Sequence, residues 1–264
     1  MLELLEELRN KTNIGILNFK FDKDEFIHHL TRWNYKKFYD KNHIEKAMEH
    51  FVSMKLLDLE KEDVVVDIAS SNSPFPEIIE EMYGCKIYKQ DLWFPQGING
   101  NIVGGDACSL PFPDNFFTKI TLHCSFEHFE GDADTRFIIE SKRVLKEEGK
   151  LCILPLYLSQ EYFNLTDPTV DRTGLVFDSG AEIREWVGWE NRFARHYDVE
   201  KLKERVLDHC GALKPIIYFL ENEKEVDDSC YLKYILIFKK ASFGLCSIEK
   251  VLKAKDNEIQ QNKK

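Results

Sequence analysis

A chain of 264 residues with 43% apolar and 12% aromatic side chains can bury a large core, which excludes extensive disorder. Its 46 acidic residues outnumber its 36 basic ones, and this net charge of −10 argues against a nucleic-acid partner. The longest apolar stretch, Leu151 to Leu158, is far shorter than the roughly 20 residues that span a bilayer. The acidic first ten residues do not resemble a secretory signal. We therefore expect one large cytoplasmic domain without a membrane span.

Residues 1–60 show mainly helical periodicity. Leu2, Leu4, Leu5 and Leu8 form a short apolar stripe, and a second stripe of helical spacing runs from Ile44 to Leu57. The sequence predicts a helical N-terminal cap over residues 1–60.

An uninterrupted β-branched run, Val64 to Val66, then predicts a central parallel strand that ends at Asp67. Ser73 and Pro74 suit the start of a helix that ends at Gly84. Further strands are expected over 86–91, 101–103, 119–124 and 150–156, with a helix over 134–146 before the last of them. This alternation is typical of an α/β fold with a parallel sheet covered by helices on both faces.

Between Ser159 and Tyr197 the periodicity fails, and a stretch of this length is usually functional. We expect residues 159–197 to form a lid-like insertion in a main domain that spans 61–240. A helix over 198–210 and two strands, 214–220 and 231–238, follow as an antiparallel hairpin at the end of a seven-stranded sheet. Residues 241–264 are polar and are expected to form a tail.

Three aspartates stand at successive strand ends: Asp67, Asp91 and Asp106. Ligands of open parallel sheets bind outside the carboxyl ends of the strands, near the point where the strand order reverses. Asp91 follows Asp67 at nearly the ~20-residue spacing at which an acid meets ribose hydroxyls in dinucleotide sites. The three carboxylates together predict a polar ligand at this edge of the sheet.

The motifs around these strand ends resemble those of class I S-adenosylmethionine-dependent methyltransferases, especially the broad type 11 group. They are VVVDIASSNS (64–73), YKQDL (88–92), GDACSLPFPDNFF (105–117), ITLHCSFEHF (120–129) and RVLKEEGKLCIL (143–154). They occur in the order and spacing of that family over residues 60–156. The resemblance implies a Rossmann-like fold and S-adenosylmethionine as cofactor.

The resemblance also implies roles for individual residues. Asp67 would order the first loop, Asp91 would hold the ribose hydroxyls, and Asp106 would accept from the adenine amino group. The full set of cofactor-binding residues implied in this way is Asp67, Ala69, Ser70, Ser71, Asp91, Leu92, Asp106, Ala107 and His123.

The first loop departs from the family pattern. The family usually has three glycines at alternate positions where this chain has Ala69, Ser71 and Ser73. Glycine is favoured there because the backbone takes positive φ and lies close to the ligand. The departure leaves open an alternative, a catalytically degenerate methyltransferase fold that acts as a binding or scaffold protein. A nicotinamide-dependent oxidoreductase would need a G-x-G-x-x-G turn, which the chain lacks.

Methyl transfer to a hydroxyl needs alignment and a general base. His128 is the leading candidate, with Glu127 beside it and His123 as a further catalytic candidate. Some related ubiquinone-pathway methyltransferases carry an E-x-x-E-H metal motif here, but Cys124 replaces its first acidic residue, so no metal is expected.

The acceptor is expected under the irregular segment, where aromatic and cationic side chains suit a sugar ring with an anionic group. The candidate substrate-binding residues are Tyr157, Arg172, Trp189, Arg195 and His196. Tryptophan and arginine would equally suit contacts in a homodimer. The sequence thus predicts O-methylation of a small molecule or saccharide.

Overall fold

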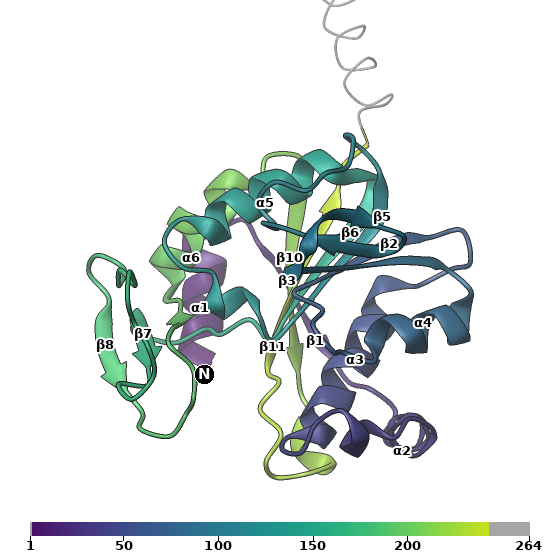
Figure 1. Cartoon of the computed structure of the whole chain (residues 1–264). Helices are drawn as coiled ribbons and strands as arrows, with labels where there is room; N and C mark the ends of the chain where they lie inside the picture. Colours follow the sequence, from purple (N-terminus) through teal and green to yellow (C-terminus); the bar gives the residue numbers. More distant parts are fainter. Residues whose placement is uncertain (1, 243–264) are drawn as a thin grey trace, which may run out of the picture.

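The computed structural model describes residues 2–242. Its strands are β1 (Gly15–Phe19), β2 (Val64–Ile68), β3 (Lys86–Asn99), β4 (Ile102–Gly104), β5 (Phe117–His123), β6 (Leu145–Leu154), β7 (Phe163–Thr166), β8 (Glu182–Glu185), β9 (Ala194–His196), β10 (Leu213–Leu220) and β11 (Tyr234–Lys240). Its α-helices are α1 (Leu2–Lys11), α2 (Lys23–Arg32), α3 (His43–Leu57), α4 (Phe75–Tyr83), α5 (Ala133–Val144) and α6 (Val199–Arg205). Figure 1 shows how these elements are arranged.

Eight strands form the main sheet in the order β1-β10-β11-β6-β5-β2-β3-β4. All its neighbouring strands are parallel except that β11 runs antiparallel to both β10 and β6. The chain passes outward from β2 to β4 on one side and from β5 to β6 on the other, so the order reverses between β2 and β5. This arrangement confirms the expected α/β fold with a mostly parallel sheet.

The sheet has one strand more than the seven expected, and that strand comes from the predicted helical cap. β1 pairs in parallel with β10, from Gly15 opposite Ile216 to Phe19 opposite Leu220. The strand lies at the sheet edge, and none of its five residues is fully buried. A short edge strand without a buried face carries no clear alternation, which explains why the sequence pattern did not reveal it. The hairpin of β10 and β11 is therefore not at the end of the sheet.

Helices cover both faces of the sheet (Figure 1). Val66 of β2 faces a core that includes Leu8 of α1 and Phe137 of α5. Its neighbour Val65 faces the other core, with Phe26 of α2 and residues of α3 and α4. The N-terminal helices are thus divided between the two faces, so they are built into the domain rather than placed over it as a cap.

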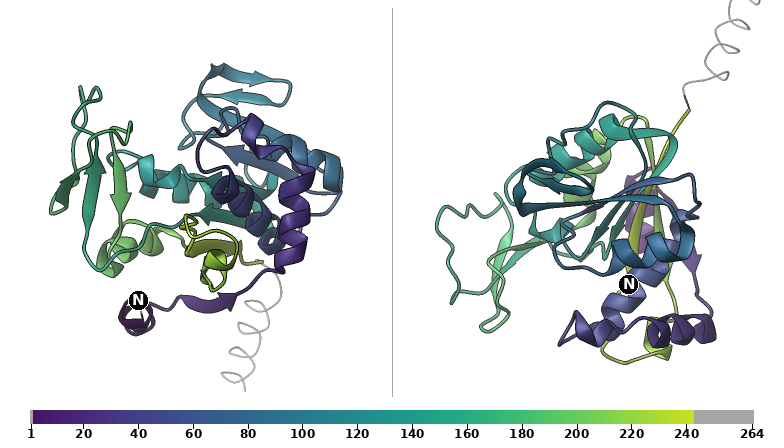
Figure 2. Two further views of the ribbon diagram at one scale, coloured as in Figure 1. Left: turned by 90° about the horizontal axis from the view of Figure 1, so that it is seen from below. Right: turned by 45° about the vertical axis from the view of Figure 1, so that its right-hand side comes forward.

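The segment expected to be irregular contains a sheet of its own. β7 pairs in parallel with β8 and antiparallel with β9, and Figure 2 shows this small sheet standing beside the main one. Its strands are three or four residues long, and β8 has no buried residue. Such short polar strands leave little periodicity in the sequence. We call residues 159–197 the lid.

Several boundaries differ by a few residues from those expected. Helix α4 begins at Phe75 rather than Pro74, although the Ser73 hydroxyl accepts a hydrogen bond from the Phe75 amide at 3.2 Å. Helix α6 ends at Arg205, and a separate 3-10 turn, Leu207–His209, completes the segment expected to be one helix. Of the expected tail, residues 243–264 lie outside the described residues.

Candidate functional site

A cavity of about 560 Å³ lies at the carboxyl ends of the strands where the strand order reverses. Its lining includes the predicted residues Ala69, Asp91, Leu92, Asp106, Ala107 and His128. These residues lie within or after four different strands, and the fold brings them to one place. We call this space the cofactor cavity, because it holds most of the residues that the motifs assign to a cofactor.

Asp91 lies within β3, directly before the register of this strand with β4 becomes irregular. One of its carboxylate oxygens accepts from the Ser71 amide at 2.9 Å, and the other accepts from the Trp93 amide at 3.0 Å. The residue is only 5% exposed, yet it lines the cofactor cavity. Each carboxylate oxygen can accept a second hydrogen bond, so the group is positioned to bind ligand hydroxyls.

Asp106 provides the second carboxylate of the cofactor cavity. It accepts from the Cys108 amide at 2.9 Å and forms an ion pair with Arg136 at 3.2 Å. Burial opposes ionisation of this side chain, but the hydrogen bonds from Cys108 and Arg136 hold its pKa below the ordinary value. Asp106 is therefore an ionised acceptor at neutral pH, suited to an amino group of a ligand.

Sequence reasoning gave no role to Gln90, which joins the loops around the cavity. Its amide nitrogen donates to the Gly105 carbonyl at 2.5 Å, and its amide oxygen accepts from the Ala69 amide at 3.4 Å. Its backbone carbonyl also accepts from the Ser70 amide at 2.9 Å. Gln90 stood in the YKQDL motif next to Asp91, but the sequence does not show that its side chain reaches two other loops.

The backbone of the first loop adopts the conformation that glycine favours, although glycine is absent from positions 69, 71 and 73. Ala69 and Ser71 have φ of 54° and 44°, in the left-handed region that side chains disfavour by roughly 1 kcal/mol or more per residue. The hydrogen bonds from these amides to Gln90 and Asp91 hold the loop in this form. The replacement of glycine by alanine and serine is thus tolerated in the backbone geometry.

A second cavity, of about 370 Å³, adjoins the first. Ile68, Ala69 and Ser125 line both cavities. The second cavity is also lined by Asp67, Ser70, Ser71, His123 and Cys124 of the main domain and by Phe38, Tyr39 and Lys46 of the N-terminal region. The Ser70 hydroxyl is buried and, within residues 2–242, has no hydrogen-bond partner. It is free to bind a polar ligand group.

His123 and Asp67 bind each other beneath the second cavity. His123 Nδ1 lies 3.2 Å from Asp67 Oδ1, and its Nε2 lies 2.9 Å from the Ser53 hydroxyl. Asp67 Oδ1 also accepts from the Thr121 hydroxyl at 2.7 Å. Both ring nitrogens of His123, a predicted catalytic candidate, are thus engaged by other side chains.

His128 has one engaged and one free ring nitrogen. Its Nδ1 donates to the Phe193 carbonyl at 2.5 Å, so in the neutral ring Nε2 carries the lone pair. Glu127 Oε1 lies 3.6 Å from that Nε2. The Trp189 ring of the lid lies beside the imidazole, with the ring centres 5.9 Å apart. The geometry of a base supported by a carboxylate is therefore present.

Three predicted substrate-binding residues lie on or near the lid. The His196 ring lies 4.9 Å from the Tyr157 ring and stacks on Phe163 at 4.1 Å. Burial lowers the pKa of His196 to about 4, so its ring is neutral at neutral pH. Arg172 forms an ion pair with Glu185 at 3.3 Å and lines neither of the two cavities.

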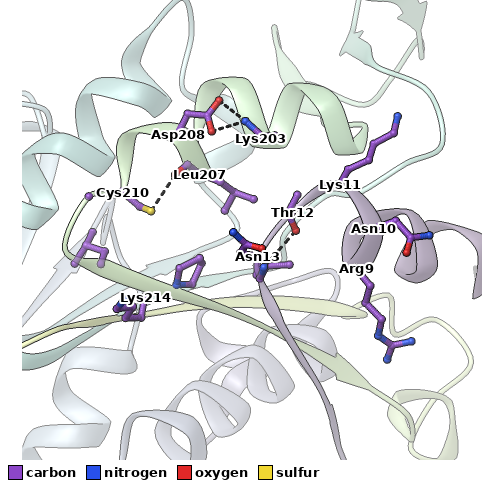
Figure 3. A pocket seen from close by; sticks show the side chains of 14 residues that line it. Arg9, Asn10, Lys11, Thr12, Asn13, Lys203, Leu207, Asp208, Cys210 and Lys214 are labelled. Carbon is purple, nitrogen blue, oxygen red and sulfur yellow. Dashed lines mark hydrogen bonds and ion pairs between the residues drawn. The ribbon is translucent and has the colours of Figure 1, made fainter.

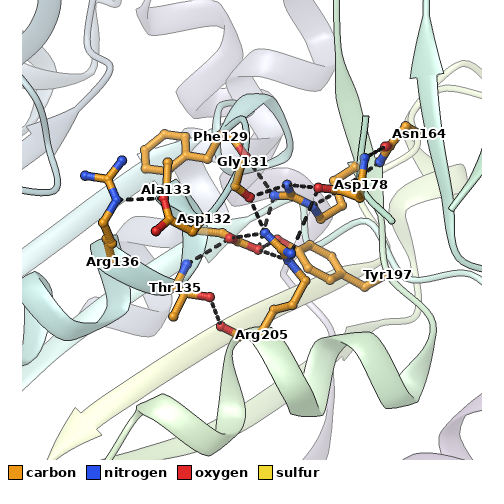
Figure 4. A network of polar contacts seen from close by, with 12 residues as sticks. Phe129, Gly131, Asp132, Ala133, Thr135, Arg136, Asn164, Asp178, Tyr197 and Arg205 are labelled. Atoms are coloured by element: carbon orange, nitrogen blue, oxygen red, sulfur yellow. Dashed lines mark hydrogen bonds and ion pairs between the residues drawn. The ribbon is translucent and has the colours of Figure 1, made fainter. Parts of the chain in front are cut away.

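Arg195, predicted to bind substrate, is instead fully buried. Figure 4 shows the polar contacts around its partners Asp178, Phe129 and Gly131. Arg195 donates to both Asp178 oxygens, at 2.7 and 2.8 Å, and to the carbonyls of Phe129 and Gly131. Its guanidinium also lies 3.1 Å from Asp134. With its donors engaged inside the protein, Arg195 joins the lid to the main domain and does not face an acceptor.

Other cavities hold none of the predicted residues. The one in Figure 3, of about 410 Å³, lies between α1 and the start of β10, and its Lys203 is paired with Asp208 at 2.6 Å. Across residues 2–242, no group of three or more His, Cys, Asp or Glu side chains is arranged to hold a metal ion. No helix in this part of the chain has the length and apolar character to cross a membrane.

The residues around the two cavities fit S-adenosylmethionine. The cofactor cavity offers carboxylates for hydroxyl and amino groups between apolar side chains such as Ile68 and Phe129. The second cavity offers the unpartnered Ser70 hydroxyl close to the first loop. These two cavities suit a ligand with a nucleoside at one end, in the cofactor cavity, and a polar chain at the other, in the second cavity.

Comparison with known proteins agrees with the motifs. The methyltransferase domain family matches residues 66–153. Demethylmenaquinone methyltransferase of Thermotoga maritima is 42% identical over 59 residues, which cover 22% of this chain and 24% of that protein. The chain thus aligns with about a quarter of the length of this curated relative.

Two solved structures cover most of the chain at low identity. A complex of the Haloferax volcanii Trm112 methyltransferase activator and a methyltransferase shares 10% identity over 83% of this chain and 98% of the other, with a TM-score of 0.49. The 1,6-didemethyltoxoflavin-N1-methyltransferase of Burkholderia thailandensis, solved with S-adenosylhomocysteine, shares 14% identity over 83% of this chain and 87% of the other, with a TM-score of 0.48. Residues 66–153 thus match the methyltransferase domain family, in agreement with the class I S-adenosylmethionine-dependent methyltransferases that the motifs resemble.

Proposed function

We propose that this protein transfers a methyl group from S-adenosylmethionine to a hydroxyl of a small molecule or saccharide. The observation that carries the proposal is the pair of fixed carboxylates, Asp91 and Asp106, in one cavity at the reversal of strand order. The second cavity, which shares Ala69 and Ser125 with the first, provides room for the rest of the reacting groups.

The residues of the chain have separate tasks in this proposal. Asp91 binds the ribose hydroxyls, Asp106 binds the adenine amino group, and Ser70 binds the polar end of the cofactor. When bound, S-adenosylmethionine supplies a methyl group on a positively charged sulfur, so the acceptor oxygen must give up a proton as it is methylated. Alignment of acceptor and methyl group provides most of the rate enhancement.

His128 accepts that proton at Nε2. The hydrogen bond from Nδ1 to the Phe193 carbonyl fixes both the tautomer and the orientation of the ring. The Glu127 carboxylate, 3.6 Å from Nε2, stabilises the positive charge that the ring then carries. Trp189 covers one side of the ring and links this step to the lid.

Calorimetric titration with S-adenosylmethionine and S-adenosylhomocysteine tests the proposal. We expect saturable binding of both, and NADH serves as a control nucleotide that should not bind. Absence of heat at millimolar cofactor, with the protein shown to be folded by circular dichroism, would remove the enzymatic function.

A non-catalytic binding protein is the second candidate, favoured by the left-handed Ala69 and Ser71 in place of glycine. An activity assay distinguishes this binding protein from the proposed enzyme. Release of S-adenosylhomocysteine in the presence of pooled hydroxylated small molecules supports the enzyme, whereas cofactor binding without release in any pool supports the scaffold.

His128→Ala should slow methyl transfer by about 10² because it removes the general base. The affinity for S-adenosylhomocysteine should change little, since Asp91 and Asp106 remain. Rates of S-adenosylhomocysteine release measure the effect, with exposed His209→Ala as the control. An undiminished rate in His128→Ala would assign catalysis to alignment alone.

A further inference from the structure

A row of buried polar side chains runs from the N-terminal helices to the first loop and has no role in the reaction described so far. It consists of His29 of α2, Tyr35 of a 3-10 turn, His50 of α3 and Ser73, and we call these four residues the polar row. The first three are buried, whereas Ser73 lines the second cavity. The polar row therefore ends at the proposed site.

Each member of the polar row is hydrogen-bonded to the next. The Tyr35 hydroxyl lies 2.9 Å from His29 Nε2 and 3.0 Å from His50 Nδ1, and His50 Nε2 lies 3.4 Å from the Ser73 hydroxyl. Burial lowers the pKa of His29 to about 4 and that of His50 well below the ordinary value, so both rings are neutral at neutral pH. A neutral ring has one donor and one acceptor nitrogen, so all the O–H and N–H groups can point the same way, from Ser73 towards His29.

The His50 ring is held in place by other rings. Its centre lies 5.0 Å from the ring centre of Phe75, the first residue of α4, and 4.8 Å from that of His123. The Tyr35 ring centre lies 5.4 Å away. The side chain is completely buried, and close packing leaves it little freedom to move. His50 is therefore a fixed hydrogen-bond partner for Ser73.

Ser73 connects the polar row to groups that face the cofactor. Its hydroxyl accepts from the Phe75 amide at 3.2 Å, and its own amide donates to the Ser70 carbonyl at 2.8 Å. The turn from Ser70 to Ser73 contains Ser71, whose amide donates to Asp91 at 2.9 Å. The position of Ser73 thus affects both the Ser70 hydroxyl and the Asp91 carboxylate, which the proposed function assigns to the cofactor.

Position 73 differs from the other two positions where the family has glycine. Ala69 and Ser71 have positive φ, which glycine would adopt without strain, whereas φ of Ser73 is not positive. The backbone therefore needs no glycine at position 73, and a side chain there can hold the loop. The two left-handed residues make the observed loop conformation less favourable than it would be with glycine. A hydrogen bond from Ser73 to a fixed partner outside the loop offsets this cost.

We propose that the polar row positions the first loop through Ser73 and so determines how tightly the polar end of the cofactor is bound. This inference rests on the proposed function and gives the N-terminal helices a part in it. His50 is a positioning residue, because it lines neither cavity and acts through Ser73. A serine at position 73 holds the loop where the family pattern has glycine. Restoring that glycine should therefore weaken cofactor binding.

Two ligands test the inference by calorimetric titration. S-adenosylhomocysteine carries the polar chain, and 5′-methylthioadenosine has the same nucleoside without the amino-acid end. Ser73→Gly should bind S-adenosylhomocysteine about tenfold more weakly, because the loop is held in its binding conformation for less of the time. The affinity for 5′-methylthioadenosine should change by less than about threefold, since Asp91 and Asp106 still hold the nucleoside. Ser73→Thr keeps a hydroxyl and should bind both ligands like the wild type. Unchanged or tighter binding of S-adenosylhomocysteine by Ser73→Gly would overturn the inference.

A double-mutant cycle separates positioning from a direct contact between Ser73 and the ligand. His50→Phe keeps a buried ring but cannot bind Ser73, so it should also weaken binding of S-adenosylhomocysteine about tenfold. Combined with Ser73→Gly, it should cause no further loss, because both changes remove the same interaction. Exposed His28→Phe is the control. Losses that add in the double variant would refute positioning by His50, and if His50→Phe does not fold, the Ser73 variants decide.

Hydrogen exchange separates this inference from the proposed function, because it is measured on the ligand-free protein. The amides of Ala69 and Ser71 are hydrogen-bonded, and both should exchange about tenfold faster in Ser73→Gly. Equal exchange in variant and wild type would refute the positioning role even if S-adenosylhomocysteine binds. Faster exchange in the variant, together with no binding of S-adenosylhomocysteine by the wild type, would count against the methyltransferase function.

Discussion

Asp91 combines two tasks at the residue scale. It accepts hydrogen bonds from the Ser71 and Trp93 amides, and it lines the cofactor cavity. The first of these bonds holds a loop whose Ser71 lies in the left-handed region. The hydrogen bond from the Ser71 amide to this carboxylate thus stabilises a backbone conformation that glycine would adopt without strain. Loss of the carboxylate should therefore weaken both the loop conformation and ligand binding.

Asp91→Ala should weaken binding of S-adenosylhomocysteine by one to two orders of magnitude, about 1.5–3 kcal/mol, the value of hydrogen bonds to a charged group. Calorimetric titration measures the dissociation constant. Asp208→Ala, which removes a surface carboxylate far from both cavities, is the control. If the constant is the same in Asp91→Ala and wild type, the nucleoside does not lie beside Asp91.

Glu45 of α3 is a buried carboxylate whose ionisation should affect the stability of the fold. Burial, together with the neighbouring Glu49, raises the pKa of Glu45 to about 8 from an ordinary 4.5. Between these two values the folded protein holds a proton that the unfolded chain has released. The free energy of unfolding should therefore decrease as the pH rises from about 5 to about 8, by at most about 1.4 kcal/mol per pH unit.

Urea unfolding at several pH values in this range measures that slope. Glu45→Gln, which mimics the protonated side chain, should flatten it. The backbone amide of Tyr231 and the ammonium of Lys46 act against the raised pKa, so the observed slope is a sum of these effects. A slope that is identical in wild type and Glu45→Gln would show that Glu45 stays ionised in the folded state.

At the scale of elements, the lid depends on one buried arginine. Arg195 of β9 binds Asp178 within the lid, together with Asp134 of α5 and the carbonyl of Gly131. Arg205 of α6 binds Asp134 as well. Together with the buried residues of β7 and β9, this network fixes how the lid lies against the main domain.

Arg195→Ala should destabilise the protein by about 3–5 kcal/mol, because it leaves the carboxylates of Asp134 and Asp178 buried with fewer partners. Urea unfolding gives the free energy, and limited proteolysis should show faster cleavage within 159–197. Lys203→Ala, which breaks an exposed ion pair, is the control and should change both measurements little. Unchanged proteolysis of the lid in Arg195→Ala would contradict the anchoring role.

At the scale of the whole molecule, the N-terminal region is part of the domain. Helix α1 buries Leu8 in the core on one face of the sheet, whereas α2 and α3 pack on the other face. Between them β1 extends the sheet beside β10. Helix α3 also contributes Lys46 to the second cavity, so the region that looked like a cap supplies part of the site.

Leu8→Ala should therefore lower the free energy of unfolding of the entire protein by about 2–5 kcal/mol, the usual cost of removing a buried leucine side chain. Urea unfolding followed by both fluorescence and circular dichroism should show one transition at a lower midpoint. Leu17→Ala in β1, where the side chain is 48% exposed, is the control. Two separate transitions would mean that residues 1–60 fold as an independent unit.

The sequence by itself determined the central sheet and the residues at its strand ends. The run Val64 to Val66 and the motifs around Asp91 and Asp106 predict their own strands and loops, because hydrophobic patterning and turn chemistry are local. Topology then requires the carboxyl ends of neighbouring parallel strands to lie together. Six of the predicted residues accordingly line one cavity.

The tertiary structure alone decided which polar side chains are free. Arg195 and His128 were both predicted to be site residues. The Arg195 guanidinium is fully buried and engaged inside the protein, whereas His128 keeps a free ring nitrogen. The burial of Glu45 and Glu49 beside Glu127 depends on the packing of α3 against strand ends more than 70 residues away in the chain. Long-range packing leaves no periodic signal in the sequence, because it is fixed by contacts between elements and not within them.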